Sequence, residues 1–369
     1  MNMDGPGWSS PVPLSADDDG TTWQVCRAWP VMTPGDYVLE VRAPGRPGVR
    51  GARLRGGRFK LIPPDDPKLP ALRAEAERGE IISYRPHRQA VIRAEGGYIK
   101  VFRPGRALIP AQRCAQVDIL LGTVTFTTPK ILFRNSPDVI VFSAIPGKTL
   151  AELGSAEAAV GDGSFTSAWE KWSRAWAAQL GSVSGPAAQR VLNSLPLHSP
   201  EAEATELWRR VDAWLRHHEN VPELSAPGDA LRAAAEQVAA NLLRNPPDPF
   251  VWAHGDLHDK QILVTDGPSP PGLLDFDSTA RAEAAFDLAD LDVHLELHLR
   301  QNRLTPARYV AAHTRVLAVA EELHVSVHRF LAYSDAIWLR LACSPQPGRL
   351  SLALAVVAER IKDHRFGPQ

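Results

Sequence analysis

Hydrophobic and polar residues alternate in short segments of roughly the first 150 residues, which is the pattern of strands with one buried face. The segments are residues 37–42, 51–55, 58–62, 80–84, 89–93, 97–102, 130–133 and 139–142. Gly56 and Gly57 separate two of them and suit the two-residue turn of a hairpin. Residues 1–20 show no periodicity, so we expect a mobile tail there. This part of the chain is therefore predicted to be rich in strands.

Further along the chain the apolar residues recur at helical spacing instead. Helices are predicted over residues 71–78, 110–121, 150–154, 165–180, 201–218, 228–243, 307–323 and 326–341, with a last helix ending at 361. Trp169, Trp172 and Trp176 lie on one face of such a helix. A tryptophan stripe can stack a sugar ring, but core packing explains it better.

A polar loop separates two short apolar strands, residues 250–253 and 262–264. The loop carries two carboxylates, two imidazoles, an ammonium and an amide: His254, Asp256, His258, Asp259, Lys260 and Gln261. Removing so many polar groups from water is costly, which indicates a functional loop. A turn rich in Pro and Gly then returns the chain as Leu273 and Leu274. We expect Asp275 to emerge beside the polar loop, so that Asp256 and Asp275 converge on one site.

These groups suit phosphoryl transfer from ATP. One carboxylate has to accept the proton of the attacking hydroxyl, while a second carboxylate and an amide oxygen hold the Mg²⁺ that bridges the phosphates. Asp256 fits the first role, and Asp275 and Gln261 fit the second.

The two segments also resemble a known family. His-Gly-Asp-x-His-x-x-Gln, residues 254–261, followed by Asp-Phe-Asp, residues 275–277, is similar to the catalytic and metal-binding segments of the aminoglycoside phosphotransferase and choline kinase family. The resemblance implies an α+β, protein-kinase-like bilobal fold with a small β-rich N-lobe and a mostly helical C-lobe. The strand pattern adds an extra β-unit at the N-terminus, which no family motif covers and whose role stays open. The corresponding domains are residues 1–78, 79–148 and 149–369.

The resemblance further implies how ATP is bound. Lys100, in the strand over residues 97–102, matches the lysine that holds the α- and β-phosphates. Its acidic partner belongs on the following helix, where Asp118 is the only acid. Backbone groups near Ala144 and Ile145, in the connection between the lobes, are expected to bind adenine. The tip of the hairpin over residues 80–93 has no Gly-x-Gly, so Arg85 or Arg88 is a candidate for contributing charge to the phosphates instead.

Other residues around the loop are expected to position it. By resemblance, His254 and Asp287 brace the loop through hydrogen bonds, and His258 is a positioning residue rather than the base. Asp277 either reaches a second Mg²⁺ or shapes the turn, and we favour the turn. Most of the family has Asn where this chain has Gln261. Sugar kinases of the maltokinase and glucosamine kinase type resemble the chain in using Gln there, which keeps neutral sugars open as acceptors.

The helix after the loop carries acids and histidines. Asp290, Asp292 and Glu296 suit a polycationic acceptor such as an aminoglycoside, but a solvated helix face explains them as well, and we favour that interpretation. His294 and His298 are four residues apart, yet no third ligand is indicated, so zinc is not predicted.

Composition narrows the function classes. The 369 residues are 44% hydrophobic and 22% charged, as in folded proteins, and the formal net charge of −1 gives no general attraction to nucleic acid. No apolar run of membrane-spanning length and no signal-peptide pattern is present, so a cytoplasmic location is expected. The three cysteines are far apart and support neither a disulfide framework nor a metal site.

The sequence therefore predicts an ATP- and Mg²⁺-dependent kinase that phosphorylates a hydroxyl of a small molecule. An aminoglycoside-like antibiotic or an amino sugar is the favoured acceptor, and a neutral sugar or biosynthetic intermediate is the alternative. A hypothesis of another class is a pseudokinase that binds nucleotide as a scaffold, which the absent Gly-rich tip would suit. No nucleic-acid or membrane partner is predicted, and the oligomeric state stays open.

Overall fold

Residues 15–61 fold as an antiparallel sheet. The computed structural model describes residues 12–121, 125–155, 161–182, 185–346 and 348–366. The sheet has the order β1 (Ser15–Asp18), β2 (Thr21–Pro30), β3 (Tyr37–Arg42), β4 (Arg50–Arg55) and β5 (Arg58–Leu61). Gly56 and Gly57, at φ 53° and 74°, form the predicted hairpin turn. The expectation of a mobile tail is wrong from Ser15 onward, because the buried side chain of Trp23 anchors β2 in the core of this sheet.

A second antiparallel sheet builds the N-lobe. Its order is β6 (Gly79–Arg85), β7 (Gln89–Ala94), β8 (Gly97–Phe102), β10 (Val139–Ser143) and β9 (Ile131–Ser136). Helix α1 (Leu72–Ala76) precedes it, and α2 (Leu108–Leu121) connects β8 to β9. Because β8 is the central strand and Ile99 and Val101 point into the core, Lys100 is held on the opposite face of the sheet.

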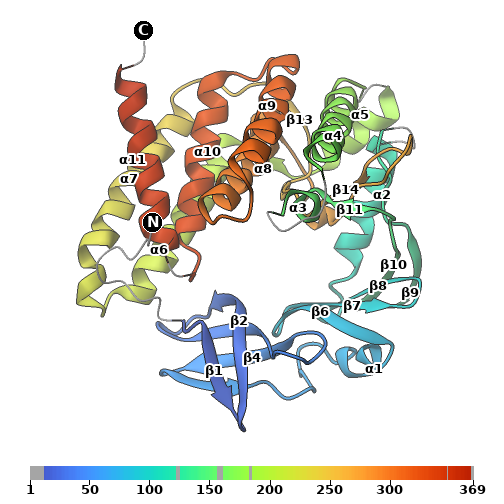
Figure 1. Ribbon diagram of the computed structural model, residues 1–369, viewed down its shortest axis with the longest axis vertical. Coiled ribbons are helices and arrows are strands. Elements are labelled where there is room, and N and C mark those ends of the chain that lie inside the picture. Colours follow the sequence, from blue (N-terminus) through green and yellow to red (C-terminus); the bar gives the residue numbers. More distant parts are fainter. Residues whose placement is uncertain (1–11, 122–124, 156–160, 183–184, 347, 367–369) are drawn as a thin grey trace.

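The N-terminal sheet is hydrogen-bonded to both neighbouring parts of the chain. On the N-lobe side, the buried carboxylate of Glu40 accepts the backbone N–H of Tyr84 at 2.6 Å. On the C-lobe side, His217 of α6 (Pro200–His218) donates from Nε2 to the carbonyl of Val31 at 2.7 Å and accepts the N–H of Gly35 at 3.3 Å. Figure 1 shows the blue sheet below α6 and beside β6.

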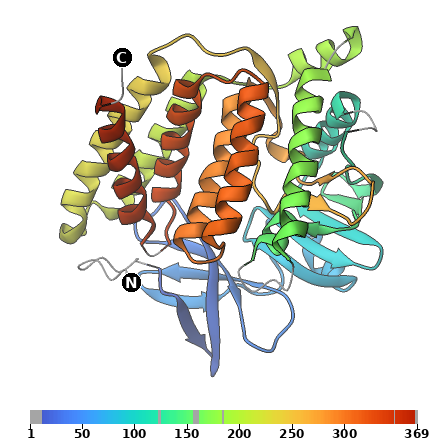
Figure 2. The same ribbon diagram turned by 45° about the horizontal axis from the view of Figure 1, so that its top comes forward.

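The C-lobe is mostly helical. Its helices are α3 (Leu150–Gly154), α4 (Asp162–Ser182), α5 (Pro186–Ser194), α6, α7 (Ser225–Leu243), α8 (Ala284–Arg300), α9 (Pro306–Glu322), α10 (Val327–Ala342) and α11 (Arg349–Phe366), with short 3-10 turns at Pro222–Leu224 and Phe276–Ser278. Figure 2 shows the orange and red helices α8 to α11 side by side, with the green α4 next to α9. Trp169, Trp172 and Trp176 of α4 are fully buried, which confirms the core interpretation.

Two small sheets support the polar loop from either end. One has the order β11 (Lys148–Thr149), β14 (Ile262–Val264) and β15 (Gly272–Leu273), and the other β12 (Leu197–His198), β16 (Ala280–Glu283) and β13 (Phe250–Ala253). The predicted strands before and after the loop are both present. The last helix runs beyond its predicted end at 361. Within the described ranges, no helix combines the length and the apolar character that crossing a bilayer requires.

Candidate active site

The polar loop, residues 254–261, is fixed at its first turn by one buried carboxylate. Asp287 of α8 accepts the backbone N–H of His254 at 2.6 Å and that of Gly255 at 2.9 Å. Burial raises the pKa of Asp287 to about 6, although the charge of His254 and the two N–H donors act to lower it. Gly255 has φ 87°, and a Cβ there would clash with the carbonyl of Ser278, so no side chain is tolerated. Asp287 thus makes the bracing contacts that the sequence predicted.

The loop is joined to the segment that carries Asp275. His254 donates from Nε2 to the carbonyl of Leu274 at 2.7 Å, and the N–H of Leu274 donates to the carbonyl of Gln261 at 2.9 Å. Asp275 follows at φ 60° and ψ 71°, a left-handed conformation that is strained for an aspartate. The structure therefore brings Asp275 to the loop as expected, with Asp256 exposed at the same edge.

Lys100 reaches this edge from the N-lobe. Its ammonium lies 2.8 Å from Asp275 and 2.5 Å from Asp277, and its side chain is only 7% exposed. Burial alone would lower the pKa of Lys100, but the two carboxylates raise it above its usual value. Lys100 in turn lowers the pKa of Asp275 against the effect of burial, whereas burial and Asp275 keep the pKa of Asp277 raised. The contact between Lys100 and Asp277 was not foreseen from the sequence.

Asp118 does not pair with Lys100 in this structure. Its carboxylate accepts the ammonium of Lys130 and the hydroxyl of Thr128, each at 2.8 Å. The predicted pairing is corrected, because the two aspartates of residues 275–277 already occupy the ammonium of Lys100. Cys114 of α2 lies within the electrostatic influence of Lys100, Asp275 and Asp277. Burial and the carboxylates raise the pKa of its thiol to about 12.

The connection between the lobes has free backbone groups. Ala144 and Ile145 lie between β10 and β11, and within the described ranges they make no backbone hydrogen bond outside regular strands. The side chain of Ile145 packs on Gly272, where a Cβ would come within 2.8 Å of it. Backbone groups left unpaired beside an apolar contact suit the edge of a purine, so the adenine-binding role stays a prediction for these two residues.

Helix α8 lines the loop with a stripe of acids and imidazoles. Asp290 and His294 follow Asp287 along the face of α8 that meets the loop: the Asp290 carboxylate lies 3.3 Å from His294, whose ring centroid is 5.3 Å from that of His258. One turn on, His298 lies 3.1 Å from Asp259. Burial and the neighbouring His294 lower the pKa of His258, whose Nδ1 accepts the N–H of Lys260 at 3.3 Å.

The acids of α8 are therefore neither an acceptor surface nor a solvated face. Asp290, Asp292 and Glu296 are all buried. Asp292 lies 2.6 Å from His313, and Glu296 lies 2.6 Å from Arg360. Both interpretations of these acids are corrected, because a helix packed on three sides by protein has no solvated face and its acids need internal partners. Within the described residues no group of three His, Cys, Asp or Glu side chains could hold a metal by itself.

The donor set at the loop nevertheless suits Mg²⁺. Asp275, Asp277 and Gln261 offer two carboxylates and an amide, all oxygen donors. Mg²⁺ usually takes one or two carboxylates and completes its shell with phosphate oxygens and water, so a cluster of three acids is not required. The side chains of Asp275 and Gln261 are both accessible to solvent.

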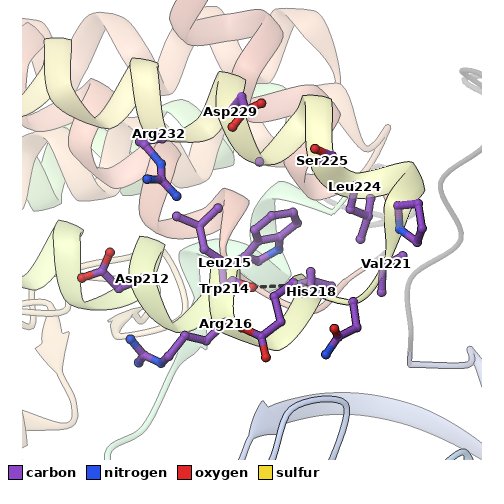
Figure 3. Close-up of a pocket in the computed structure, with 14 residues that line it drawn as sticks. Asp212, Trp214, Leu215, Arg216, His218, Val221, Leu224, Ser225, Asp229 and Arg232 are labelled. Atoms are coloured by element: carbon purple, nitrogen blue, oxygen red, sulfur yellow. Dashed lines mark hydrogen bonds between the residues drawn. The ribbon is translucent and has the colours of Figure 1, made fainter.

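A separate pocket of about 830 Å³ lies between α6 and α7, outside the loop. Figure 3 shows Trp214, Leu215 and His218 on one side and Asp229 and Arg232 on the other. His218 donates from Nδ1 to the carbonyl of Trp214 at 2.7 Å and stacks on the same indole at 4.2 Å between centroids. None of the residues of the loop lines this pocket.

The chain is similar to several solved structures. A GDP complex of a mutant aminoglycoside 2'-phosphotransferase matches with a TM-score of 0.50 and 15% identity, over 79% of this chain and 96% of the other. A glucosamine kinase matches at a TM-score of 0.47 and 18% identity over 97% and 96%, and an ethanolamine kinase from Plasmodium vivax at 0.49 and 13% over 78% and 85%. The first match confirms the predicted α+β, protein-kinase-like fold.

Among curated protein sequences, none matches the chain. Residues 100–323, however, match the profile of the Phosphotransferase enzyme family (APH). The match begins at Lys100 and includes Asp256, Gln261, Asp275 and Asp287, the residues that the structure gathers around the loop. The family predicted from the two sequence segments is confirmed, and the chain belongs to the Phosphotransferase enzyme family.

Proposed function

We propose that this protein transfers the γ-phosphate of ATP to a hydroxyl group of a small molecule. The observation that carries the proposal is the 2.8 Å ion pair between Lys100 and Asp275. The ion pair joins β8, whose Lys100 is proposed to contact the nucleotide phosphates, to the segment of Asp275, which is proposed to hold the metal. His254 and Leu274 tie that segment to the loop of Asp256.

In the proposed reaction, the carboxylate of Asp256 accepts the proton of the acceptor hydroxyl. The hydroxyl oxygen then forms a bond to the γ-phosphorus while the bond between that phosphorus and the bridging oxygen of ADP breaks, and ADP leaves with the electron pair. Asp256 suits this role because it is exposed directly after the first turn of the loop, whose backbone is fixed by Asp287. Lys100 would exchange one carboxylate partner for phosphate oxygens when ATP binds.

Asp275 and Gln261 are proposed to hold Mg²⁺, with Asp277 as a further candidate. Bound there with ATP, Mg²⁺ would neutralise charge that develops on the phosphates. Backbone groups of Ala144 and Ile145 are proposed to bind adenine. We also propose a cytoplasmic location, because ATP is supplied there.

Family membership favours an aminoglycoside-like antibiotic or an amino sugar as the acceptor. Gln261 keeps neutral sugars as the alternative. The acids of α8 no longer support a polycationic acceptor, because all three are buried and because Asp292 and Glu296 are ion-paired within the protein. The acceptor proposal therefore rests on the family and on the loop alone.

The test is ADP release from Mg-ATP across a panel of aminoglycosides, amino sugars, neutral sugars and sugar acids. The native protein is compared with Asp256→Asn and with Asp266→Asn, a matched change at an exposed aspartate in the turn between β14 and β15. We expect acceptor-dependent ADP release from the native protein and from Asp266→Asn. Asp256→Asn should lose at least about 10²-fold in kcat while its affinity for Mg-ATP is kept.

A second readout separates an enzyme from a nucleotide-binding scaffold. Mg-ATP binding without turnover of any acceptor in the panel, and without a difference between native protein and Asp256→Asn, would favour the scaffold. Absence of Mg-ATP binding would contradict the site itself.

A further inference from the structure

Asp66, in the Pro-rich segment between β5 and α1, is a buried carboxylate with four hydrogen bonds. It accepts the N–H of Lys68 at 2.9 Å, the hydroxyl of Tyr84 at 2.8 Å, and the N–H and Nδ1 of His87 at 2.7 and 2.8 Å. Burial acts to raise the pKa of Asp66, but the four hydrogen bonds lower it below its ordinary value. Three of the four donor groups belong to the hairpin formed by β6 and β7.

His87 extends this contact to the N-terminal sheet. The guanidinium of Arg53 on β4 donates to Nε2 of His87 at 2.8 Å. Because a guanidinium can only donate, Nε2 accepts, and Nδ1 carries the proton that His87 gives to Asp66. The backbone of His87 has φ 62°, a left-handed conformation that these contacts hold in place.

The tip of the hairpin, residues 85–89, also fits closely against the N-terminal sheet. Gly51 of β4 is buried, and a Cβ there would come within 2.5 Å of the ring of Tyr84 and 2.9 Å of the ring of Pro86. Only glycine allows so close an approach. The carboxylate of Glu40 on β3 accepts the N–H of Tyr84 at 2.6 Å beside it. The tip is therefore docked on the sheet by packing and by hydrogen bonds.

The tip lies beside the strand that carries Lys100. In the pairing of β7 with β8, Val91 is opposite Lys100, and the tip begins two residues away from Val91 along β7. Arg103, the residue after β8, donates from Nε to the carbonyl of His87. In a kinase-like N-lobe the hairpin at this place covers the phosphates of the nucleotide. The tip is thus placed to cover the phosphates that Lys100 is proposed to hold.

Residues 86–88 leave no backbone N–H group for a phosphate. Pro86 has none. The N–H of His87 is donated to Asp66, and that of Arg88 to the carbonyl of Arg85 at 3.0 Å. A phosphate-binding loop of the Gly-rich kind needs free N–H groups. Any contact from this tip to a phosphate therefore has to come from a side chain.

The tip carries two arginines, and their guanidinium groups differ in their surroundings. That of Arg85 is half-buried and lies 5.3 Å from the ring of Trp29 on β2. Arg88 is exposed, and among the described residues its guanidinium has neither an ion-pair nor a hydrogen-bond partner. Arg88 follows His87 directly, so the contacts of His87 set where its side chain starts.

We propose that Asp66 and His87 are positioning residues that hold the tip as a pre-formed cover over the nucleotide, and that Arg88 makes the side-chain contact to the phosphates of ATP. The proposal rests on the kinase function proposed above. It gives the N-terminal sheet a role, because Gly51 and Arg53 of β4 support the cover. The shape of the tip is then set before ATP binds.

The experiment measures the binding of Mg-ATP and of adenosine by calorimetry, with no acceptor present. Adenosine has no phosphates, so a defect in the cover weakens the binding of Mg-ATP alone. Arg88→Gln should weaken Mg-ATP binding about threefold to tenfold and leave adenosine binding unchanged. Arg58→Gln, at an exposed arginine of β5, is the matched control and should bind both ligands as the native protein does.

Asp66→Asn and His87→Asn test the positioning. The first turns an amide N–H₂ toward donors, and the second tolerates the left-handed backbone but loses the imidazole bridge between Asp66 and Arg53. Each should weaken Mg-ATP binding about threefold to tenfold, spare adenosine binding, and speed hydrogen exchange in residues 85–89. Asp65→Asn, at the exposed neighbour, should do none of these.

A double variant tests whether the two groups act through one contact. If Asp66 only positions Arg88, the variant with both Asp66→Asn and Arg88→Gln should bind Mg-ATP no more weakly than Arg88→Gln alone. Losses that add in the double variant would contradict a role of Asp66 through Arg88.

The remaining outcomes separate the cover from the kinase function. Mg-ATP binding that Arg88→Gln and His87→Asn leave unchanged would overturn the cover while the proposed function stands. Equal weakening of Mg-ATP and adenosine would also overturn it, because it would report a general disturbance of the N-lobe. A native protein that binds neither ligand would contradict the proposed function and the cover together. If Asp66→Asn does not fold, His87→Asn decides the positioning.

Discussion

At the scale of single residues, Lys100 and Asp118 of the N-lobe form ion pairs with different partners. Lys100 is buried and bridges to Asp275 and Asp277 in the C-lobe, whereas Asp118 is engaged with Lys130 at the surface of the N-lobe. The sequence identified Lys100 through its place in a strand and through the family resemblance. It could not exclude Asp118, because helix spacing places a side chain on a face but does not say which of two lysines it meets.

Lys100→Ala should raise KM for ATP at least about tenfold and lower kcat, because the phosphates lose their buried cation and two carboxylates remain uncompensated. Asp118→Asn should change KM for ATP less than about twofold, since its ion pair is exposed. Steady-state kinetics at varied ATP distinguishes the two. Equal effects of both substitutions would contradict the pairing of Lys100 with Asp275 and of Asp118 with Lys130.

Asp335 of α10 gives the fold a dependence on pH. Burial raises its pKa to about 7, and Arg360, whose guanidinium lies 3.7 Å away, acts in the opposite direction. Between the ordinary value of 3.8 and about 7 the folded state holds this proton more tightly than the unfolded state, so the free energy of unfolding falls as pH rises through that window.

Asp335→Asn should remove this part of the pH dependence and stabilise the protein at pH 8 relative to pH 5, by about 1 kcal/mol or more. Urea unfolding at the two pH values measures it, with Asp229→Asn, an exposed aspartate of α7, as the matched control. An unchanged difference between pH 5 and pH 8 would show that Asp335 titrates normally.

At the scale of elements, the polar loop depends on one contact with α8. Asp287 accepts two successive backbone N–H groups, those of His254 and Gly255, and Gly255 has no room for a side chain. Local sequence predicted the loop and its flanking strands well, because apolar runs ended by Gly and Pro are short-range signals. It missed β1 and β2, whose alternation is weak and which are held by pairing between strands, β2 with β3 and β1 with β2.

Asp287→Asn should lower the free energy of unfolding by about 1–3 kcal/mol, because the amide can accept fewer of the two N–H bonds and its own N–H₂ faces donors. We expect kcat to fall as well, with KM for ATP less affected, since the change displaces the loop of Asp256. Denaturant unfolding and kinetics on the same preparations measure both. Lost activity at full stability would assign Asp287 a direct chemical role instead.

At the scale of the whole molecule, the N-terminal sheet contacts both lobes. The contacts join residues far apart in the chain, such as Val31 and His217, and no periodicity within one segment reports them. For the same reason the sequence left the role of this sheet open. The family segments, by contrast, were found because their spacing is local.

His217→Ala should loosen the sheet from the C-lobe while Glu40 keeps it on the N-lobe. We expect faster hydrogen exchange in the turn over residues 31–36, with little change in β6 to β10. His328→Ala, at an exposed histidine of α10, is the control. Unchanged exchange in the turn would mean that this contact adds nothing to the docking of the sheet.

The N-terminal sheet is attached to both the N-lobe and the C-lobe, so it connects the two lobes to each other. The lobes are also joined directly, by the covalent connection at residues 144–147 and by the ion pairs of Lys100 with Asp275 and Asp277. On the C-lobe side the sheet is held by the two hydrogen bonds of His217, worth about 1 kcal/mol each, and by the contact between the rings of His217 and Tyr37, whose centroids are 5.5 Å apart. A movement of one lobe away from the other would therefore have to break these contacts or carry the sheet along.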